Sequence, residues 1–337
     1  MKALVLKNPG EAVIQDVRDL VRVPDQVLLK VRSVGFCGTD LSSFRGKNPL
    51  ITYPRILGHE VAATVVEESS LRPDLLRGTD VMLSPYASCG ICPSCRRNRP
   101  NACQFNETMG VQRDGALREF IQGPVDKIFP AALSITELCM VEPFAVGFHA
   151  VARGRVTAED TVAVIGCGGV GLGAVAGAGF RGARTIAIDV DSVKLEIARK
   201  AGAAHLINTT SDSLEDRLRE LTDGCGPDVI IEAAGQPATF RAAVELVAFT
   251  GRVVYIGYAK ENVAYETRFF VQKELDIMGS RNALPENFRE VIRMLEEKRF
   301  PVTEYVTATV PLDAAPEMLR QWSDSPERFT KIMVRID

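Results

Sequence analysis

Short apolar runs alternate with amphipathic stretches through the middle of the chain. The runs lie at 161–165, 185–189, 205–208, 228–232, 252–257 and 275–279. Between them, residues at 193–201, 213–221 and 238–247 repeat with helical spacing, and Asp191 or Ser192 suits the cap of the first helix. Parallel strands that are buried on both faces need helical crossovers. The pattern therefore predicts an α/β fold with a doubly wound parallel sheet of six strands.

The sequence before and after this α/β region has a different pattern of hydrophobic and polar residues. From residue 1 to about residue 130, glycine and proline divide the chain into short strand-like segments such as 26–34 and 60–67. Helical stretches at 285–298 and 312–323 and a closing strand at 331–336 follow the sheet pattern, and we expect them to return to the first region. The predicted domains are residues 1–148 and 149–282, with a C-terminal segment, 283–337, that rejoins the first domain.

Composition narrows the range of partners. The chain has 337 residues, 46% of them hydrophobic, and a formal net charge of -3. This near balance offers no attraction to nucleic acid or to an anionic membrane, so we expect small-molecule partners. The N-terminus lacks the basic start and apolar run of a signal peptide, which predicts a cytoplasmic location. Residues 161–180 carry no charge, but seven of them are glycine, which argues against a membrane helix.

A glycine-rich segment, G-C-G-G-V-G, directly follows the first apolar run. Gly166, Gly168 and Gly171 fit the dinucleotide fingerprint, in which the chain turns tightly and its backbone approaches a pyrophosphate. Asp189 ends the next run, where a carboxylate can accept hydrogen bonds from ribose hydroxyls. A simple structural turn is the alternative, but this context predicts a dinucleotide site that prefers NAD to NADP. We also assign to the cofactor site Gly169, Val170, Lys194, Gly257, Ser280 and Arg281.

The eight cysteines point to metal chemistry, because cytosolic thiols seldom form disulfides. Four of them follow the pattern C-x2-C-x2-C-x7-C in a lobe at about 86–105. Four thiolates complete the coordination of a structural zinc ion. An iron-sulfur cluster also takes four thiolates, and buried thiols without a metal are the remaining alternative. The spacing favours a structural zinc ion at Cys89, Cys92, Cys95 and Cys103.

Further candidate ligands are dispersed along the chain. Cys37 lies in G-F-C-G-T-D, His59 and Glu60 lie in G-H-E, and Glu142 lies in V-E-P-F. Spacing alone does not join them, and each by itself would be interpreted as structural. In order, however, C-G-T-D, G-H-E, the four-cysteine lobe, E-P-F-A-V-G-F-H-A and G-C-G-G-V-G resemble the zinc-containing medium-chain dehydrogenases, the superfamily of alcohol, sorbitol and threonine dehydrogenases. The segment G-S-R-N at 279–282 is similar to the polyol branch, which includes sorbitol and L-galactonate dehydrogenases.

This resemblance implies a fold and a site. The sheet domain would be a Rossmann domain, and the first domain would be a GroES-like β-barrel that the C-terminal segment completes. Cys37 and His59 would hold a catalytic zinc ion with Glu60 or Glu142, and the sequence does not choose between these two acids. Asp40 would orient the ligand histidine. Relatives are usually dimers or tetramers, so we expect a homodimer or a homotetramer.

The resemblance also implies zinc-dependent oxidation of a secondary hydroxyl in a small polyol or sugar acid, with hydride transfer to NAD. Thr39 would accept the substrate proton. Ser42 stands where many relatives have histidine, so the proton would leave through water, through Ser42 or Ser43, or through a different residue. We therefore expect a high-pH optimum. Arg281 would suit the carboxylate of a sugar acid, and a phosphate contact or a surface salt bridge is the alternative role for it. A threonine-type or other secondary-alcohol dehydrogenase and a nucleotide-binding protein without turnover are the alternatives.

Overall fold

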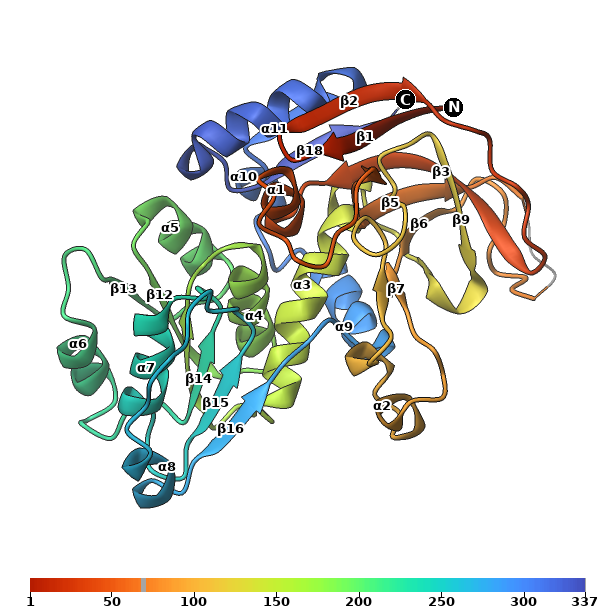
Figure 1. Ribbon diagram of the computed structural model, residues 1–337. Coiled ribbons are helices and arrows are strands. Elements are labelled where there is room, and N and C mark those ends of the chain that lie inside the picture. The colour runs from red at the N-terminus through yellow and green to blue at the C-terminus, as the bar shows by residue number, and fades with distance from the viewer. Residues whose placement is uncertain (68–70, 337) are drawn as a thin grey trace. The chain divides into compact units, whose positions relative to one another are not determined.

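The computed structural model describes residues 1–67 and 71–336. The chain forms two compact units. Unit 1 comprises Met1–Glu142 and Val302–Asp337, and unit 2 comprises Pro143–Pro301. Unit 1 is therefore built from both ends of the sequence, whereas unit 2 is continuous (Figure 1).

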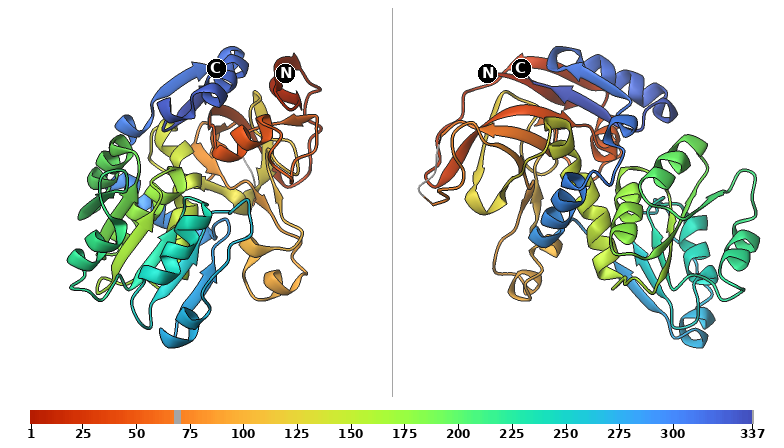
Figure 2. Two further views of the ribbon diagram at one scale, coloured as in Figure 1. Left: turned by 60° about the vertical axis from the view of Figure 1, so that its left-hand side comes forward. Right: turned by 180° about the vertical axis from the view of Figure 1, so that it is seen from behind.

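Unit 2 contains the predicted six-stranded sheet, with strand order β13-β12-β11-β14-β15-β16 and every neighbouring pair parallel. Helices lie on both sides of this sheet (Figures 1 and 2). The strands are β11 (Thr161–Ile165), β12 (Arg184–Asp189), β13 (His205–Asn208), β14 (Val229–Glu232), β15 (Arg252–Tyr255) and β16 (Asp276–Gly279). The helices are α4 (Gly169–Phe180), α5 (Ser192–Lys200), α6 (Leu214–Leu221), α7 (Pro237–Leu246), α8 (Arg268–Gln272) and α9 (Pro285–Glu296). The predicted doubly wound fold is confirmed.

Strand β11, one of the two central strands of this sheet, shows why the sequence has continuous apolar runs at its strands. All five residues of β11 are buried, because strands pair with it on both edges and helices cover its faces. Burying one large aliphatic side chain contributes about 1.5–3 kcal/mol relative to leaving it exposed. Asp191 caps α5, since its carboxylate accepts hydrogen bonds from the backbone of Val193 and Lys194. The sequence predicted this cap among its two candidates.

Unit 1 is rich in β-structure. Its larger sheet has the order β10-β6-β5-β3-β18-β17, with β9 also paired to β3, and a smaller sheet has the order β2-β1-β4. The strands are β1 (Lys2–Asn8), β2 (Glu11–Asp16), β3 (Gln26–Gly35), β4 (Arg55–Ile56), β5 (Glu60–Val65), β6 (Asp80–Leu83), β7 (Tyr86–Ala87), β8 (Glu107–Thr108), β9 (Phe120–Pro124), β10 (Ile128–Pro130), β17 (Ala308–Pro311) and β18 (Ile332–Arg335). The helices are α1 (Gly38–Phe44), α2 (Pro93–Arg96), α10 (Val302–Tyr305) and α11 (Ala315–Asp324).

The C-terminal strand returns to unit 1, as the sequence predicted. Strand β18 pairs antiparallel with β3 and parallel with β17. One hydrophobic core therefore contains residues from both ends of the chain, including Leu4, Leu29, Leu319 and Val334.

The boundaries differ from the predicted divisions at 148/149 and 282/283. The structure divides the chain after Glu142 and after Pro301. Helix α9, which we expected to rejoin the first domain, instead belongs to unit 2. Its buried face packs there, and Asn287 on that face lies 3.0 Å from His149 Nδ1. An amphipathic pattern shows that a helix packs on something, but it does not say on which neighbour.

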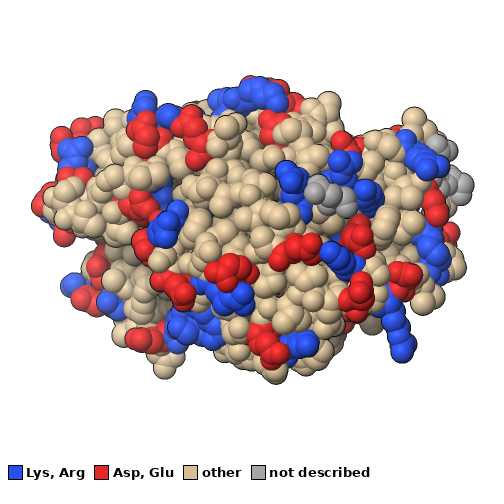
Figure 3. Space-filling view, turned by 90° about the horizontal axis from the view of Figure 1, so that it is seen from above, with Lys and Arg blue, Asp and Glu red and all other residues tan. Residues whose placement is uncertain are grey.

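One long helix was not predicted from the sequence. Helix α3 (Ile135–Arg153) is apolar around most of its surface and contains Pro143. By length and composition it could cross a membrane, but 72% of its most apolar window is buried inside the protein. In addition, acidic and basic side chains are interspersed on the face shown in Figure 3. These observations agree with a helix that forms part of a protein core.

Candidate functional site

Pairing of two strands brings the dispersed metal ligands together. Strand β3 leads into Cys37, which caps α1, and β5 begins at Glu60 directly after His59. In the β3–β5 ladder Gly35 lies opposite Glu60, and a Cβ atom at Gly35 would lie only 2.0 Å from Glu60 Oε2. The ligand atoms of Cys37, His59 and Glu60 consequently all lie within 4.8 Å of one another. A thiol, an imidazole and a carboxylate in such a group suit a zinc ion.

Asp40 contacts the two segments that carry Cys37 and His59. Its Oδ2 accepts a hydrogen bond from the Cys37 amide at 2.9 Å, and its Oδ1 accepts one from the Gly58 amide at 3.4 Å. The same Oδ1 lies 4.0 Å from His59 Nδ1, which has no hydrogen-bond partner among residues 1–67 and 71–336. Asp40 and His59 are 1% and 4% exposed. The structure thus places Asp40 beside the histidine, as the sequence predicted.

The electrostatics of the group favour a cation. Burial lowers the pKa of His59, but the neighbouring Cys37, Asp40 and Glu142 outweigh burial and raise this pKa well above its usual value. Anionic groups that raise the pKa of a buried histidine stabilise positive charge at that place. A divalent cation would meet the same requirement, so the residues present fit a bound zinc ion.

Lys331 was missed by the sequence analysis. It lies just before β18, is 5% exposed, forms an ion pair with Glu60, and donates a hydrogen bond to the Phe36 carbonyl at 3.1 Å. Burial raises the pKa of Glu60 to about 7, although Lys331 opposes this shift. Burial would lower the pKa of Lys331, but Glu60 and Tyr305 raise it above its usual value. A lysine at the start of a buried strand was the one available signal, and its partner depended on strand pairing.

Glu142 has a different position from Glu60. It projects from α3, is 4% exposed and accepts a hydrogen bond from the hydroxyl of Tyr86, another residue that the sequence analysis missed. Burial raises the pKa of Tyr86 well above its usual value, and the charge of Glu142 is the second largest cause of this shift. Glu142 lies close enough to affect Glu60 and His59, but it is not in the group whose ligand atoms lie within 4.8 Å. The geometry therefore favours Glu60 as the carboxylate ligand.

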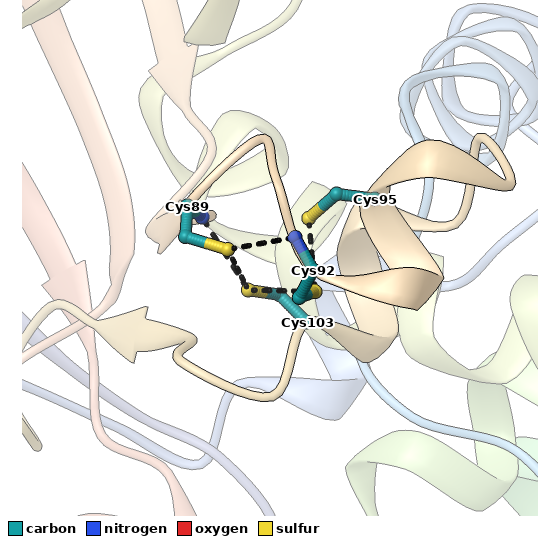
Figure 4. Close-up of side chains that lie close together, drawn as sticks. All are labelled: Cys89, Cys92, Cys95 and Cys103. Carbon is teal, nitrogen blue, oxygen red and sulfur yellow. Dashed lines mark hydrogen bonds between the residues drawn. The ribbon is translucent and has the colours of Figure 1, made fainter.

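The four remaining predicted ligands form a compact cluster (Figure 4). Sγ–Sγ distances are 3.4 Å for Cys92–Cys95, 3.8 Å for Cys92–Cys103 and 3.6 Å for Cys103–Cys89. Sulfurs that share a tetrahedral zinc ion with bonds of about 2.3 Å lie about 3.8 Å apart. Backbone amides, for example that of Phe105, also donate to the sulfurs. The cluster fits one structural zinc ion, at the residues that the sequence predicted.

The glycine turn also has the expected form. Gly166 follows β11 with φ +96°, Gly168 caps α4, and Gly169 and Val170 begin the helix. A Cβ atom at Gly171 would lie 1.7 Å from the Gly166 carbonyl oxygen, so only glycine permits this contact. The exposed amino end of α4 can then receive a phosphate.

Asp189 ends β12 beside this turn. One of its carboxylate oxygens accepts a hydrogen bond from the Cys167 amide at 2.6 Å, and the other accepts one from the Val190 amide at 2.8 Å. Lys194 Nζ lies 3.6 Å from Oδ2 of Asp191, the residue that caps α5, and the two form an ion pair. A carboxylate at the end of the second strand is in the position that a ribose-binding acid takes in this fold.

The other predicted cofactor residues follow the next strands of the sheet. Gly257 comes shortly after β15, and Ser280 and Arg281 follow β16. Because all six strands are parallel, these residues lie at the same edge of the sheet as the glycine turn. Ser280 is 8% exposed, and its hydroxyl has no hydrogen-bond partner among the described residues.

Each of the two units matches a known family of protein domains. A family profile described as an alcohol dehydrogenase GroES-like domain matches residues 23–133, and one described as a zinc-binding dehydrogenase matches residues 169–297. Sorbitol dehydrogenase of Bacillus subtilis is 34% identical, over 95% of this chain and 94% of its own. The chain belongs to the zinc-binding alcohol dehydrogenase family. It is therefore an oxidoreductase, with the GroES-like and Rossmann-like domains that the sequence predicted.

Other relatives of this dehydrogenase are similar along their whole length. L-galactonate-5-dehydrogenase of Escherichia coli K12 is 32% identical, over 94% of each chain. The crystal structure of RspB from E. coli CFT073, complexed with the cofactor NADH, has a TM-score of 0.90 and 27% identity, and the match covers 99% of each chain. The resemblance to the polyol branch is thus confirmed at the level of the family.

In this dehydrogenase α1 carries the residues predicted for proton transfer. The hydroxyl of Thr39 lies 3.7 Å from the thiol of Cys37. Ser43 is buried and donates its hydroxyl proton to the Thr39 carbonyl at 2.8 Å, so this proton is engaged within the helix. Ser42 is half-buried. Of the two serines that the sequence proposed for proton exit, the structure therefore favours Ser42.

Proposed function

We propose that this dehydrogenase oxidises a secondary hydroxyl of a small polyol or sugar acid and transfers the hydride to NAD. The group formed by half-buried Cys37 and buried His59 and Glu60 supports this proposal most directly. Similarity to sorbitol dehydrogenase and L-galactonate-5-dehydrogenase suggests the substrate class.

The chain's own residues divide the work of catalysis. Cys37, His59 and Glu60 would hold the catalytic zinc ion, while Asp40 keeps the histidine oriented. A bound zinc ion lowers the pKa of a neighbouring hydroxyl and so favours its deprotonation. The Thr39 hydroxyl, beside Cys37, can accept the substrate proton and donate its own proton onward, and half-buried Ser42 can connect it to water. Neither hydroxyl acts as a base near pH 7, so we expect a high-pH optimum.

The coenzyme preference depends on Asp189. A carboxylate at this position attracts ribose hydroxyls and repels the 2′-phosphate of NADP. We expect kcat/KM to be at least about tenfold higher for NAD than for NADP. Steady-state kinetics with both coenzymes tests this preference, and a higher kcat/KM for NADP than for NAD would contradict it.

Arg281 is proposed to distinguish acids from neutral polyols, because a guanidinium pairs with a carboxylate through two hydrogen bonds. The variant Arg281→Ala should raise KM for an aldonate more than for a polyol. If the two KM values rise equally, Arg281 has no role in recognising the carboxylate.

One experiment tests the proposed function as a whole. The zinc-loaded protein is assayed for NADH formation with a panel of polyols, aldonates and amino alcohols, with and without a chelator. Turnover of a polyol or aldonate that the chelator abolishes is expected. Turnover of amino alcohols alone would indicate a threonine-type dehydrogenase. Bound zinc and NAD without any turnover would indicate a nucleotide-binding protein.

We further propose that the enzyme is cytoplasmic, is a homodimer or homotetramer, and acts without nucleic acid or membrane partners. Its near-balanced charge of -3 supports the exclusion of nucleic acid. Size-exclusion chromatography with light scattering measures the oligomeric state, and a monomer at micromolar concentration would contradict the proposal.

A further inference from the structure

A buried carboxylate lies at the carboxyl end of β14, which pairs with β11 at the centre of the sheet in unit 2. Glu232 ends β14 and is 0% exposed. In the parallel ladders it lies opposite Ile165 on one side and Tyr255 on the other. Ile165 directly precedes the glycine turn, and Tyr255 precedes the segment that contains Gly257. Glu232 is therefore central to the edge where we placed the coenzyme.

One oxygen of this carboxylate organises the loop that follows its own strand. Oε1 of Glu232 accepts hydrogen bonds from the amides of Ala234 at 2.9 Å and Gly235 at 2.7 Å, and from the hydroxyl of Thr239 at 2.8 Å. The two amides belong to the loop after β14, and the hydroxyl belongs to α7. The two amides and the Thr239 hydroxyl, whose single proton also lies within reach of the Gln236 carbonyl oxygen at 2.8 Å, fix the loop to the first turn of the helix.

The same residue controls the loop after the next strand. The backbone carbonyl of Glu232 accepts hydrogen bonds from the amides of Ile256 at 2.9 Å and Gly257 at 3.2 Å. A Cβ atom at Gly257 would lie 2.5 Å from Glu232 Oε2 and 2.6 Å from the Gly235 amide nitrogen. Gly257 therefore packs directly against the carboxylate, and a larger residue there would displace it.

The second carboxylate oxygen has no compensating interaction. Glu232 Oε2 is buried without a hydrogen-bond partner in the described part of the chain. Leaving a buried acceptor unsatisfied is costly, and burial raises the pKa of this acid even though Thr239 and the loop amides oppose the shift. Costly arrangements of this kind are often retained where they fix the geometry of a binding site.

We propose that Glu232 is a positioning residue for the dinucleotide, because its carboxylate fixes the loop 233–236 by hydrogen bonds and packs against Gly257 in the next loop at the coenzyme edge of the sheet. This role rests on the use of NAD proposed above. Loops that are ordered before binding spare the coenzyme the entropic cost of ordering them, which increases its affinity. Glu232 is expected to act on coenzyme binding and not on recognition of the alcohol.

The chain offers a matched control at the opposite end of the same strand. Asp228 directly precedes β14, and its Oδ2 accepts a hydrogen bond from the Thr161 amide at 2.7 Å. Its backbone carbonyl accepts one from the Arg252 amide at 2.9 Å. Asp228 thus also connects β14 to its neighbours, but at the amino edge of the sheet, away from the glycine turn.

The test compares Glu232→Ala, Glu232→Gln and Asp228→Ala in the zinc-loaded full-length protein. Fluorescence titration gives the Kd for NADH, kinetics give KM for NAD and for the alcohol, and hydrogen exchange reports on the loop at 233–236. For Glu232→Ala we expect Kd and KM for NAD to rise about tenfold, KM for the alcohol to stay within about twofold, and exchange to accelerate. Glu232→Gln should stay within about threefold of the wild type, because its amide oxygen can accept the same three donors.

The control decides whether the effect is specific. Asp228→Ala should lower the melting temperature but leave Kd for NADH within about twofold. Equal effects of the two alanine variants on Kd, or no effect of Glu232→Ala, would overturn the positioning role. If Glu232→Ala does not fold, Thr239→Val removes one of the three donors and should raise Kd about threefold, and an unchanged Kd would overturn the role. If the wild type itself does not bind NADH, the proposed function fails, whereas loss of the difference between variants affects Glu232 alone.

Discussion

The two proposed zinc sites are assembled in opposite ways. The four-cysteine cluster takes all its ligands from Cys89 to Cys103, and a short loop brings them together. The group of Cys37, His59 and Glu60 instead depends on the β3–β5 ladder and on Lys331, which is 271 residues from Glu60. A local site can be recognised from spacing, whereas the spacing of a dispersed site does not show that its residues meet. We expect the dispersed site to determine catalytic activity and the cysteine cluster to determine stability, and the following variants test this division.

The largest expected effect is that of Cys37→Ala. Loss of a zinc ligand should reduce kcat by about a thousandfold or more, since metal activation contributes several kcal/mol to the transition state. Metal analysis should show one zinc ion fewer, while the cysteine cluster keeps its own. The control is Cys225→Ala, because Cys225 is exposed and lies outside both groups. If Cys37→Ala keeps more than a tenth of the activity, the catalytic assignment is wrong.

Cys103→Ser should act on stability. Cys103 is fully buried and contacts two other thiols of the cluster. Loss of the structural ion should lower the melting temperature by roughly 5–10 °C, while kcat per folded molecule changes less than about twofold. Differential scanning calorimetry and active-site titration measure the two quantities. A loss of kcat as large as that of Cys37→Ala would show that the two sites do not have separate roles.

Lys331→Ala tests the long-range part of the dispersed site. Removing one partner of a buried ion pair leaves an uncompensated charge and should lower the free energy of unfolding by about 3 kcal/mol. Lys2→Ala is the control, since the ion pair of Lys2 with Asp313 is exposed and should contribute less than about 1 kcal/mol. Chemical denaturation of both variants gives the comparison. Equal small losses would mean that Lys331 does not stabilise Glu60.

The smallest of these effects is expected for Asp40→Asn. The variant keeps the shape of the side chain but removes the charge beside His59, which should reduce activity or zinc affinity about 10- to 100-fold. Competition with a chelator measures the affinity, and kinetics at saturating zinc measures the activity. An unchanged zinc affinity together with an unchanged kcat would remove Asp40 from the site.

The same contrast explains what the sequence could predict. The parallel sheet, the glycine turn at Gly166 and the cysteine cluster all rest on local patterns, and the structure has all three. Helix α3 was not predicted, because a helix that is buried around most of its surface lacks an amphipathic period. The ion pair between Lys331 and Glu60 was not predicted either, because it depends on the pairing of β18 with β3.

The resemblance to a family supplied what local patterns could not. It joined Cys37, His59 and Glu60, which the structure groups within 4.8 Å. It left Glu60 and Glu142 as equal candidates, and the positions of their carboxylates distinguish them, because only Glu60 belongs to the group whose ligand atoms lie within 4.8 Å of one another. A choice between two buried acids requires knowledge of their partners, and these partners are distant in sequence.

The return of β18 to β3 has a consequence for synthesis of the protein. A ribosome releases the residues of unit 2, Pro143–Pro301, before it has made the last strand of unit 1. The six-stranded sheet of unit 2 can therefore be completed before the larger sheet of unit 1, although most of unit 1, Met1–Glu142, has emerged earlier. Until β18 has been made, residues Ser33 to Gly35 of β3 lack their partner strand on one edge, and an unpaired strand edge is a site for unwanted association. A chain that stops before Lys331 would leave the nascent catalytic unit permanently in that vulnerable state.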